Sequence, residues 1–390
     1  MSETRTQPSA SPATDVSLTR RARALVEAGT TDMADDLLRV PLRYYRDPDT
    51  FERERLLLQR TPLALVESAR IPAAGDFVVR EVLGTSVLLS RGADGVARAL
   101  LNHCRHRGAT VASGCGTARR HACPYHAWTY ASDGTLVGLP GQEGFAAMDR
   151  SEHGLVELPT EERHGLVWAV LTVGEPIDVA AHLGPLDDEL GSWGFAGYEH
   201  LTERLLHGAV SWKGALEAFA ENYHFPYVHG GSIVGMNTVA NTAAFDTYGP
   251  HHRLAFPCPW ITDIPEDSPP LHGMALIYWI FPNLVLAVSP VGVEIIDILP
   301  GADPTSCSLR HGWMATIPAG DDETTRSGYQ ELYEAVHAAV RDEDFALLPG
   351  CGQTTRQGQF DHLVIGRNEP GVQNVVRGFA TALGLDLTTT

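Results

Sequence analysis

Two short pairs of potential metal ligands constrain this chain more than any other feature. Cys104 and His106 lie in the run NHCRHRG, and Cys123 and His126 lie in the run ACPYHAW, with sixteen residues between the pairs. Two thiolates and two imidazoles on paired loops can bind one tetrahedral zinc ion, or a [2Fe–2S] cluster that has two histidines on one iron. Paired zinc ligands are usually two to four residues apart, so the single residue within C-x-H favours the cluster.

A second pair of histidines, His224 and His229, follows in the run WKGALEAFAENYHFPYVH. On an unbroken helix, residues five apart lie about 140° apart around the axis and could not share a small ion. Pro226 lies between them, and a helix tends to end before a proline, so the chain can turn and bring the histidines together. With one carboxylate added, they would form the 2-His-1-carboxylate triad that leaves open positions on Fe(II).

The order of predicted elements indicates an α+β chain with two folded domains. From 62 to 175, short β-prone runs divided by Gly and Pro predict a small antiparallel β domain. From 176 to 390, strands over 275–281, 284–288 and 293–299 are followed by helices over 321–348 and 372–383, which indicates an antiparallel sheet flanked by helices. We expect a disordered tail over 1–17 and an N-terminal helical segment over 18–61, packed on the second domain.

Charge and composition exclude several classes of function. The 390 residues carry a formal charge of −19, which would repel nucleic acid and anionic membranes. No apolar run approaches the roughly 20 residues of a membrane span, and the N-terminus has no secretion signal. Six cysteines are too few for a disulfide scaffold. We therefore expect a cytoplasmic protein.

The motifs CRHRG and CPYHAW, with the later WK…ENYH…H run, resemble the catalytic α subunit of the Rieske non-haem iron oxygenases of the aromatic-ring-hydroxylating type. The resemblance extends from about residue 40 to 383. It implies an N-terminal Rieske [2Fe–2S] domain and a C-terminal catalytic domain with mononuclear Fe(2+). Two sets of ligands are implied: Cys104, His106, Cys123 and His126 for the cluster, and His224 and His229 for the iron.

The same resemblance implies two acidic site residues. The family's third iron ligand is an Asp on a late helix, and within the run RDEDFALL the match falls on Asp344. The adjacent Asp342 and Glu343 fit a solvated acidic cluster. Glu221 matches the residue that links the two metal centres across a subunit boundary, where it meets the cluster histidine matched by His126. The family more often has Asp there, and Ala218 replaces its usual Asn.

The resemblance also implies the activity and the partners. A terminal oxygenase of this type uses O2 and electrons from a separate NAD(P)H-dependent reductase, directly or through a ferredoxin, to hydroxylate or oxidatively demethylate a small organic substrate. An aromatic or amine substrate and a homotrimer are expected. No Gly-rich flavin or NAD fingerprint occurs in the sequence, which fits a separate reductase. Strands that carry Tyr278, Trp279, Phe281, Asn283 and Val285 are expected near the pocket, with their facing set by register.

Three other interpretations remain open from the residues alone. A zinc-binding interaction module and a Rieske electron carrier without catalysis would each use the Cys–His loops. A di-iron carboxylate oxygenase could use Glu221-x-x-His224 and Glu334-x-x-His337. That site needs a four-helix bundle, which the strands between 275 and 299 argue against. We expect His337, seven residues before Asp344, to lie near the iron without binding it.

Overall fold

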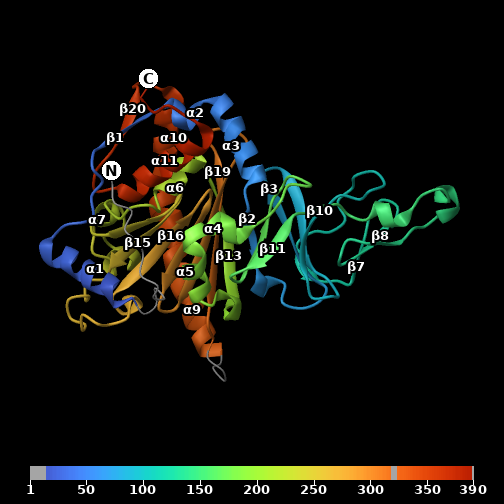
Figure 1. Cartoon of the computed structure of the whole chain (residues 1–390), viewed down its shortest axis with the longest axis horizontal. Coiled ribbons are helices and arrows are strands. Elements are labelled where there is room, and N and C mark those ends of the chain that lie inside the picture. The colour runs from blue at the N-terminus through green and yellow to red at the C-terminus, as the bar shows by residue number, and fades with distance from the viewer. Residues whose placement is uncertain (1–14, 318–322, 389–390) are drawn as a thin grey trace.

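The computed structural model describes residues 15–317 and 323–388. A large body built on a seven-stranded sheet carries a smaller β domain that extends from one side (Figure 1). The α+β fold class expected from the sequence is confirmed. Residues 1–14 of the predicted tail lie outside the described residues, and helix α1 (Val16–Ala28) begins within its last residues.

The smaller β domain contains three short antiparallel sheets. The five-stranded sheet has the order β10-β5-β4-β3-β6, and two three-stranded sheets have the orders β11-β12-β2 and β7-β8-β9. Their bounds are β2 (Leu63–Glu67), β3 (Asp76–Val82), β4 (Thr85–Arg91), β5 (Ala97–Leu101), β6 (Cys115–Thr117), β7 (Arg120–Ala122), β8 (Thr129–Ala131), β9 (Leu136–Gly138), β10 (Glu157–Leu158), β11 (Thr160–Arg163) and β12 (Leu166–Ala169).

The large body is organised by one fully antiparallel sheet of order β13-β19-β18-β17-β16-β15-β14. Both faces of its central strands are largely covered, which explains why they read as near-continuous apolar runs rather than as an alternation. The three strands predicted over 275–281, 284–288 and 293–299 are confirmed, with every end within one residue of the prediction. The bounds are β13 (Glu199–Gly208), β14 (Ala244–Tyr248), β15 (His251–Pro257), β16 (Met274–Ile280), β17 (Leu284–Ser289), β18 (Gly292–Pro300) and β19 (Cys307–Ala315).

Helices cover this sheet, and the late ones agree with the sequence prediction. The segment predicted to be helical over 321–348 forms α9 (Glu323–Ala339), a π-helical turn (Val340–Asp344) and α10 (Phe345–Gln357); residues 321–322 lie outside the described residues. The last helix, α11 (Pro370–Leu383), starts at a proline and ends at a left-handed glycine. The remaining helices are α4 (Val179–Leu183), α5 (Asp187–Ser192), α6 (Trp212–Glu217), α7 (Phe225–Val228) and α8 (Ile233–Met236).

The N-terminal segment is less helical than predicted. It contains α1, α2 (Arg43–Arg46) and α3 (Pro48–Arg60), and the Asp47 carboxylate caps α3 by accepting from the Thr50 amide at 2.8 Å. A strand, β1 (Leu38–Pro41), interrupts these helices because it pairs with β20 (His362–Ile365), more than 300 residues later. α1 packs on β14 and β15, and α3 packs on α11.

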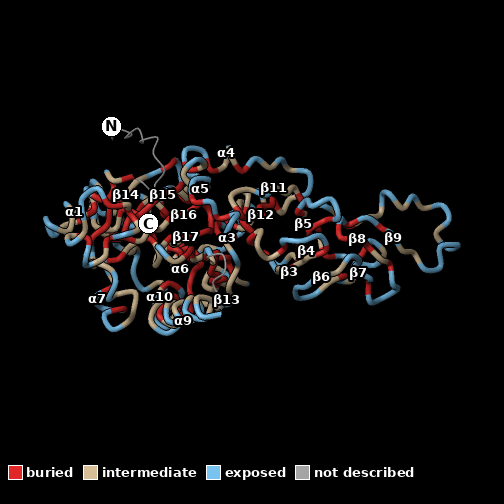
Figure 2. Tube along the Cα trace, turned by 90° about the horizontal axis from the view of Figure 1, so that it is seen from below, coloured by how far each residue is buried: buried red, intermediate tan, exposed pale blue. Residues whose placement is uncertain are grey.

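One hydrophobic core joins the two domains. It includes Val78 and Val87 of the smaller domain together with Ile296, Leu309 and Phe379 of the larger body. Figure 2 shows buried residues concentrated in the large body, whereas the loop after β9 at the other end is mostly exposed. In the described ranges, no helix is both long and apolar enough to cross a bilayer.

Candidate metal centres

The Cys–His pairs lie in two loops with the same backbone pattern. In each loop, the cysteine amide donates to the carbonyl five residues later, Ala109 or Trp128, and the cysteine carbonyl accepts from the amide four residues later, Gly108 or Ala127. Gly108 and Ala127 both adopt a left-handed conformation, which allows such a tight turn. The first loop leaves β5 and the second connects β7 to β8, so the small domain presents both at one end.

These loops bury the thiols and expose the imidazoles. Cys104 and Cys123 are nearly inaccessible, whereas His106 and His126 lie at the surface, with their Nδ1 atoms 3.2 Å apart. Desolvation and the nearby His126 and Arg107 lower the pKa of His106, which favours the neutral imidazole that a metal requires. Two inner thiolates and two outer imidazoles fit a cluster that has cysteine on one iron and histidine on the other.

A single zinc ion fits these loops less well. Among the residues that the structure describes, one group of three donor atoms lies within 4.8 Å of one another. This group does not include any residue of the Cys–His loops. Donors of one tetrahedral ion must all lie about 2.0–2.3 Å from it, so they crowd together. The wider spacing suits a two-iron cluster.

Side chains behind the loops complete this site. The Trp128 ring stacks on His106 at 5.0 Å between ring centroids. The Tyr130 hydroxyl lies 3.3 Å from the Cys104 sulfur and accepts from the Arg105 amide at 2.9 Å. Burial and the Cys104 thiol raise the pKa of Tyr130, so its proton remains available to the sulfur. Such hydrogen bonds to sulfur are one of the means by which proteins tune cluster potentials.

The second donor group is formed by His224, His229 and Asp344. The two histidine Nε2 atoms are 3.3 Å apart, and the Asp344 Oδ1 atom lies 3.5 Å from His224 Nε2 and 3.1 Å from His229 Nε2. Two imidazoles and one carboxylate that converge on one point match the donor set of a facial triad.

The chain reaches this geometry differently from the prediction. The helix does not run to Pro226: α6 ends at Glu217, the intervening residues are irregular, and Pro226 lies in the first turn of α7. His224 precedes this short helix and His229 follows it, so both rings lie at its ends. Asp344 closes the π-helical turn between α9 and α10, an irregularity that is frequent at functional sites.

Each histidine has a carboxylate on its other ring nitrogen. His224 Nδ1 hydrogen bonds to Glu221, and His229 Nδ1 lies 2.6 Å from a Glu343 oxygen. A proton held at each Nδ1 leaves the Nε2 lone pairs free to face Asp344 and a metal. Burial lowers the pKa of His224, but hydrogen bonds to Asp344 and Glu221 outweigh it and raise the pKa to about 9, so a metal that binds Nε2 displaces a proton from it.

Glu343 is a residue whose role the sequence did not indicate. It was expected to belong to a solvated cluster with Asp342, and only Asp342 fits that expectation, since it pairs with Arg341 at the surface. A sequence motif does not show which of two adjacent acidic residues on a helical turn points towards the interior.

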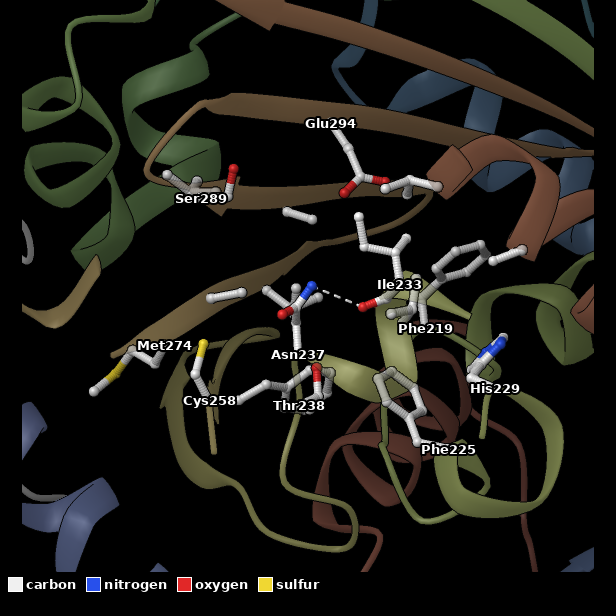
Figure 3. Close-up of a pocket in the computed structure, with 18 of the residues that line it drawn as sticks. Phe219, Phe225, His229, Ile233, Asn237, Thr238, Cys258, Met274, Ser289 and Glu294 are labelled. Atoms are coloured by element: carbon white, nitrogen blue, oxygen red, sulfur yellow. Dashed lines mark hydrogen bonds between the residues drawn. The ribbon is translucent and has the colours of Figure 1, made fainter. Parts of the chain in front are cut away.

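An apolar cavity of about 610 Å³ adjoins the triad (Figure 3). Glu221, His224, His229 and Asp344 lie in its wall. Of the strand residues expected near a pocket, Val285 lines the cavity. Tyr278 points elsewhere and donates to Glu189 at 2.7 Å. The apolar side chains that line it include Phe219, Phe225, Ile233, Val234, Phe256, Trp260, Leu271, Met274, Ile277, Val285, Ile296, Trp313 and Leu332.

The second Glu-x-x-His pair has other partners and is not part of the donor group. His337 Nδ1 is 3.1 Å from His311 Nδ1, and Glu334 pairs with Arg204 at the surface. The fold is also a large sheet rather than a four-helix bundle, so the geometry does not support a di-iron site.

Comparison with known proteins identifies both domains. Residues 61–154 match the Rieske [2Fe–2S] domain, and residues 195–384 match the ring hydroxylating alpha subunit (catalytic domain). The chain belongs to the family of Rieske non-haem iron oxygenase α subunits. It therefore carries a [2Fe–2S] cluster and a mononuclear non-haem iron, the cofactors of these two domains.

Individual relatives share part of the chain. The carnitine monooxygenase oxygenase subunit of Escherichia coli (strain K12) is 31% identical over 205 residues, which are 49% of this chain and 52% of that protein. The anthranilate 1,2-dioxygenase large subunit of Burkholderia cepacia is 33% identical over 217 residues, 50% of this chain and 48% of that protein. The chain thus spans about half the length of the curated relatives it matches.

A solved structure extends the likeness of fold to most of the chain. The crystal structure of a quaternary ammonium Rieske monooxygenase in complex with L-carnitine has a TM-score of 0.76 and 20% identity, and the match covers 91% of this chain and 96% of that chain.

Proposed function

We propose that this protein is the terminal oxygenase component of a multi-component system that hydroxylates or oxidatively demethylates a small organic substrate. The observation that carries the proposal is the presence, in one chain, of two different donor sets, one of which adjoins a large apolar cavity. A pure electron carrier would need neither the triad nor the cavity, and a zinc module would need neither donor set in this form.

We assign the cluster to Cys104, His106, Cys123 and His126 and the iron to His224, His229 and Asp344. The cluster supplies single electrons, and the iron supplies open positions at which O2 is activated. The protein's own residues set the conditions for this chemistry. Glu221 and Glu343 hold a proton on each histidine Nδ1 and fix the ring orientation. The apolar cavity excludes water from the reacting centre and positions the substrate.

The electrons would come from a separate NAD(P)H-dependent reductase, directly or through a ferredoxin. The relatives of this chain include the oxygenase subunit of a carnitine monooxygenase and the large oxygenase component of a dinitrotoluene dioxygenase system. Both names describe one component of a larger enzyme system. The thiol ligands need a reducing compartment, which supports the cytoplasm as the place of action.

We also propose a homotrimer in which electrons cross between chains. Figures 1 and 2 both place the cluster loops, beside β7 and β8, at the opposite end of the molecule from α7. The two iron histidines flank α7. Electrons would therefore enter the iron site from the cluster of a neighbouring copy, past Glu221. The solved structure of a quaternary ammonium Rieske monooxygenase is reported to reveal insights into inter-subunit electron transfer in that protein.

The decisive experiment separates the two metal sites. Cys104→Ser should abolish the visible Rieske spectrum, because a thiolate ligand is lost, whereas Cys115→Ser, an exposed cysteine of the same domain, should leave it intact. His224→Ala should retain the spectrum, lose one iron per chain and lose substrate turnover, measured by oxygen-18 incorporation with a generic reductase. A His224→Ala protein with full iron content and turnover would contradict the proposal, as would a Cys104→Ser protein with a full spectrum.

A further inference from the structure

Glu294 is an acidic residue in a mostly apolar cavity wall. The cavity is predominantly apolar, and its other two carboxylates, Glu221 and Asp344, belong to the metal site. No Lys or Arg among the described residues lines the cavity. A third carboxylate therefore faces an apolar space without a protein cation, which is costly unless something else compensates the charge.

The sheet register directs Glu294 into the cavity. Glu294, on β18, lies opposite Ala287 of β17 and Trp313 of β19, and all three line the cavity. Figure 3 shows the Glu294 carboxylate projecting from its strand into the cavity, across it from Phe225 and Thr238. The side chain retains 18% exposure although its strand is central to the sheet.

Two buried histidines lie behind Glu294 and orient its carboxyl group. His311 Nε2 lies 2.9 Å from one Glu294 oxygen, and His311 Nδ1 lies 3.1 Å from His337 Nδ1. Burial, with His311 and Arg341, lowers the pKa of His337 to about 4, so that ring is neutral at neutral pH.

The second Glu294 oxygen, Oε1, has no hydrogen-bond partner in the described part of the chain. The carboxylate is thus oriented by one bond from behind and keeps one oxygen for a ligand in the cavity.

We propose that Glu294 is a specificity-determining residue that binds a positively charged nitrogen of the substrate. This inference rests on the proposed function, since it takes the cavity as the substrate site. An organic cation with an apolar body would satisfy both the carboxylate and the apolar walls. Trp313, the cross-strand neighbour of Glu294, also lines the cavity, and its ring would add a cation–π contribution. A substrate with a carboxylate at that position would be repelled.

The test compares a cation with its neutral isostere in the holoprotein. Dissociation constants of phenyltrimethylammonium and tert-butylbenzene are measured by calorimetric titration of the wild type and of Glu294→Gln. We expect the variant to bind the cation at least tenfold more weakly, because it loses the charge but keeps the shape, and to bind tert-butylbenzene as the wild type does. A loss of less than threefold for the cation, or an equal loss for both ligands, would overturn the proposal.

Two further proteins serve as controls. Glu199→Gln removes the same charge from an exposed pair with Arg326, so it accounts for the general attraction of cations by a chain of net charge −19. It should leave both dissociation constants unchanged. Glu294→Asp retains the charge and should retain most of the cation affinity. If neither Glu294 variant folds, the two dissociation constants of the wild type still test the inference. A wild type that binds tert-butylbenzene but not phenyltrimethylammonium would contradict it.

Failure of this inference is distinguishable from failure of the proposed function. The Rieske spectrum and the iron content of the same wild-type sample report on the two metal centres. If both are present and the Glu294 result is negative, the oxygenase stands and only the cation specificity is wrong. If the iron is absent from the holoprotein, the proposed function itself fails.

Discussion

Glu343 and Asp342 are neighbours with the same charge, yet they meet different partners. Glu343 hydrogen bonds to His229 Nδ1 at 2.6 Å, whereas Asp342 pairs with Arg341 at the surface. The partner of a metal-binding histidine fixes its ring and raises its basicity, and losing such a partner commonly weakens metal binding 10- to 100-fold. The function of each acid thus depends on its direction from the helical turn rather than on its chemistry.

This difference predicts the result of a matched pair of substitutions. Glu343→Gln should weaken binding of the mononuclear iron about tenfold, because an amide oxygen accepts less strongly than a carboxylate. Asp342→Asn should leave it unchanged. Iron affinity is measured by competition with a chelator, and the Rieske spectrum should be the same in both variants. Equal affinities for the two variants would show that Glu343 has no positioning role.

At the scale of elements, the irregular turns matter more than the regular helices. The π-helical turn presents Asp344, and the short helix α7 presents both histidines, so the triad depends on how α9, α10 and α7 pack against the sheet. Gly352 lies at one such contact on α10: a Cβ added there would lie 1.9 Å from the Ala209 carbonyl oxygen. The close approach of α10 to the end of β13 therefore requires a glycine.

We expect Gly352→Ala to destabilise the protein by about 1–3 kcal/mol, because backbone must move to admit the methyl group. Gly350→Ala, two residues earlier on the same helix, meets nothing within 4 Å and should be neutral or stabilise by about 0.5–1 kcal/mol through helix propensity. Urea unfolding of the two variants tests this prediction. Similar midpoints would mean that α10 can shift freely away from Ala209.

At the scale of the whole molecule, a buried ionic network joins the two domains. Arg310 of β19 contacts Glu67 of β2 at 2.5 Å and Asp297 of β18 at 2.5 Å, and Arg80 of β3 also contacts Asp297 at 3.1 Å. Burial raises the pKa of Glu67, but the Arg310 guanidinium outweighs it and lowers the pKa to about 2, from an ordinary 4.5. The network is therefore satisfied only when Arg310 is present and the carboxylates are ionised.

We expect Arg310→Leu to cost about 3–5 kcal/mol at neutral pH, since it leaves two buried carboxylates short of a partner. Because the pKa of Glu67 is lowered in the folded state, its contribution is fully present above about pH 4.5 and is lost as the pH falls towards 2. The difference between wild type and variant in urea midpoint should therefore shrink between about pH 7 and about pH 3. Arg204→Leu, in an exposed pair with Glu334, should change the midpoint little at either pH. A pH-independent difference would contradict this account.

The proposed trimer predicts complementation between two inactive variants. Cys104→Ser should lack the cluster and His224→Ala should lack the iron, so each alone should be inactive. When the two are co-expressed, some interfaces in the mixed rings pair a sound cluster with a sound iron, and partial turnover should return. Turnover of the mixture is compared with that of the separately purified variants. No recovery in verified mixed rings would show that both centres serve only their own chain.

The sequence alone determined the features that depend on neighbours in the chain. The Cys–His spacing, the His224/His229 pair and the apolar runs of the central strands each come from short segments, and their chemistry or periodicity can be recognised without a fold. The fold class and the family followed from these segments. The position of Pro226 in the first turn of a helix was missed, because the backbone around it is set by packing of the loop.

Only the tertiary structure decided what depends on distant contacts. Asp344 lies beside His224, which is 120 residues earlier in the chain. The sequence indicated Asp344 as a ligand only through the resemblance to a known family. The choice of Glu343 over Asp342 beside His229, the pairing of β1 with β20 and the direction of Glu294 into the cavity had no local signal. The physical reason is common to them: a side chain on a helix or strand acquires its partner when another element packs against that face, and packing is a property of the whole chain.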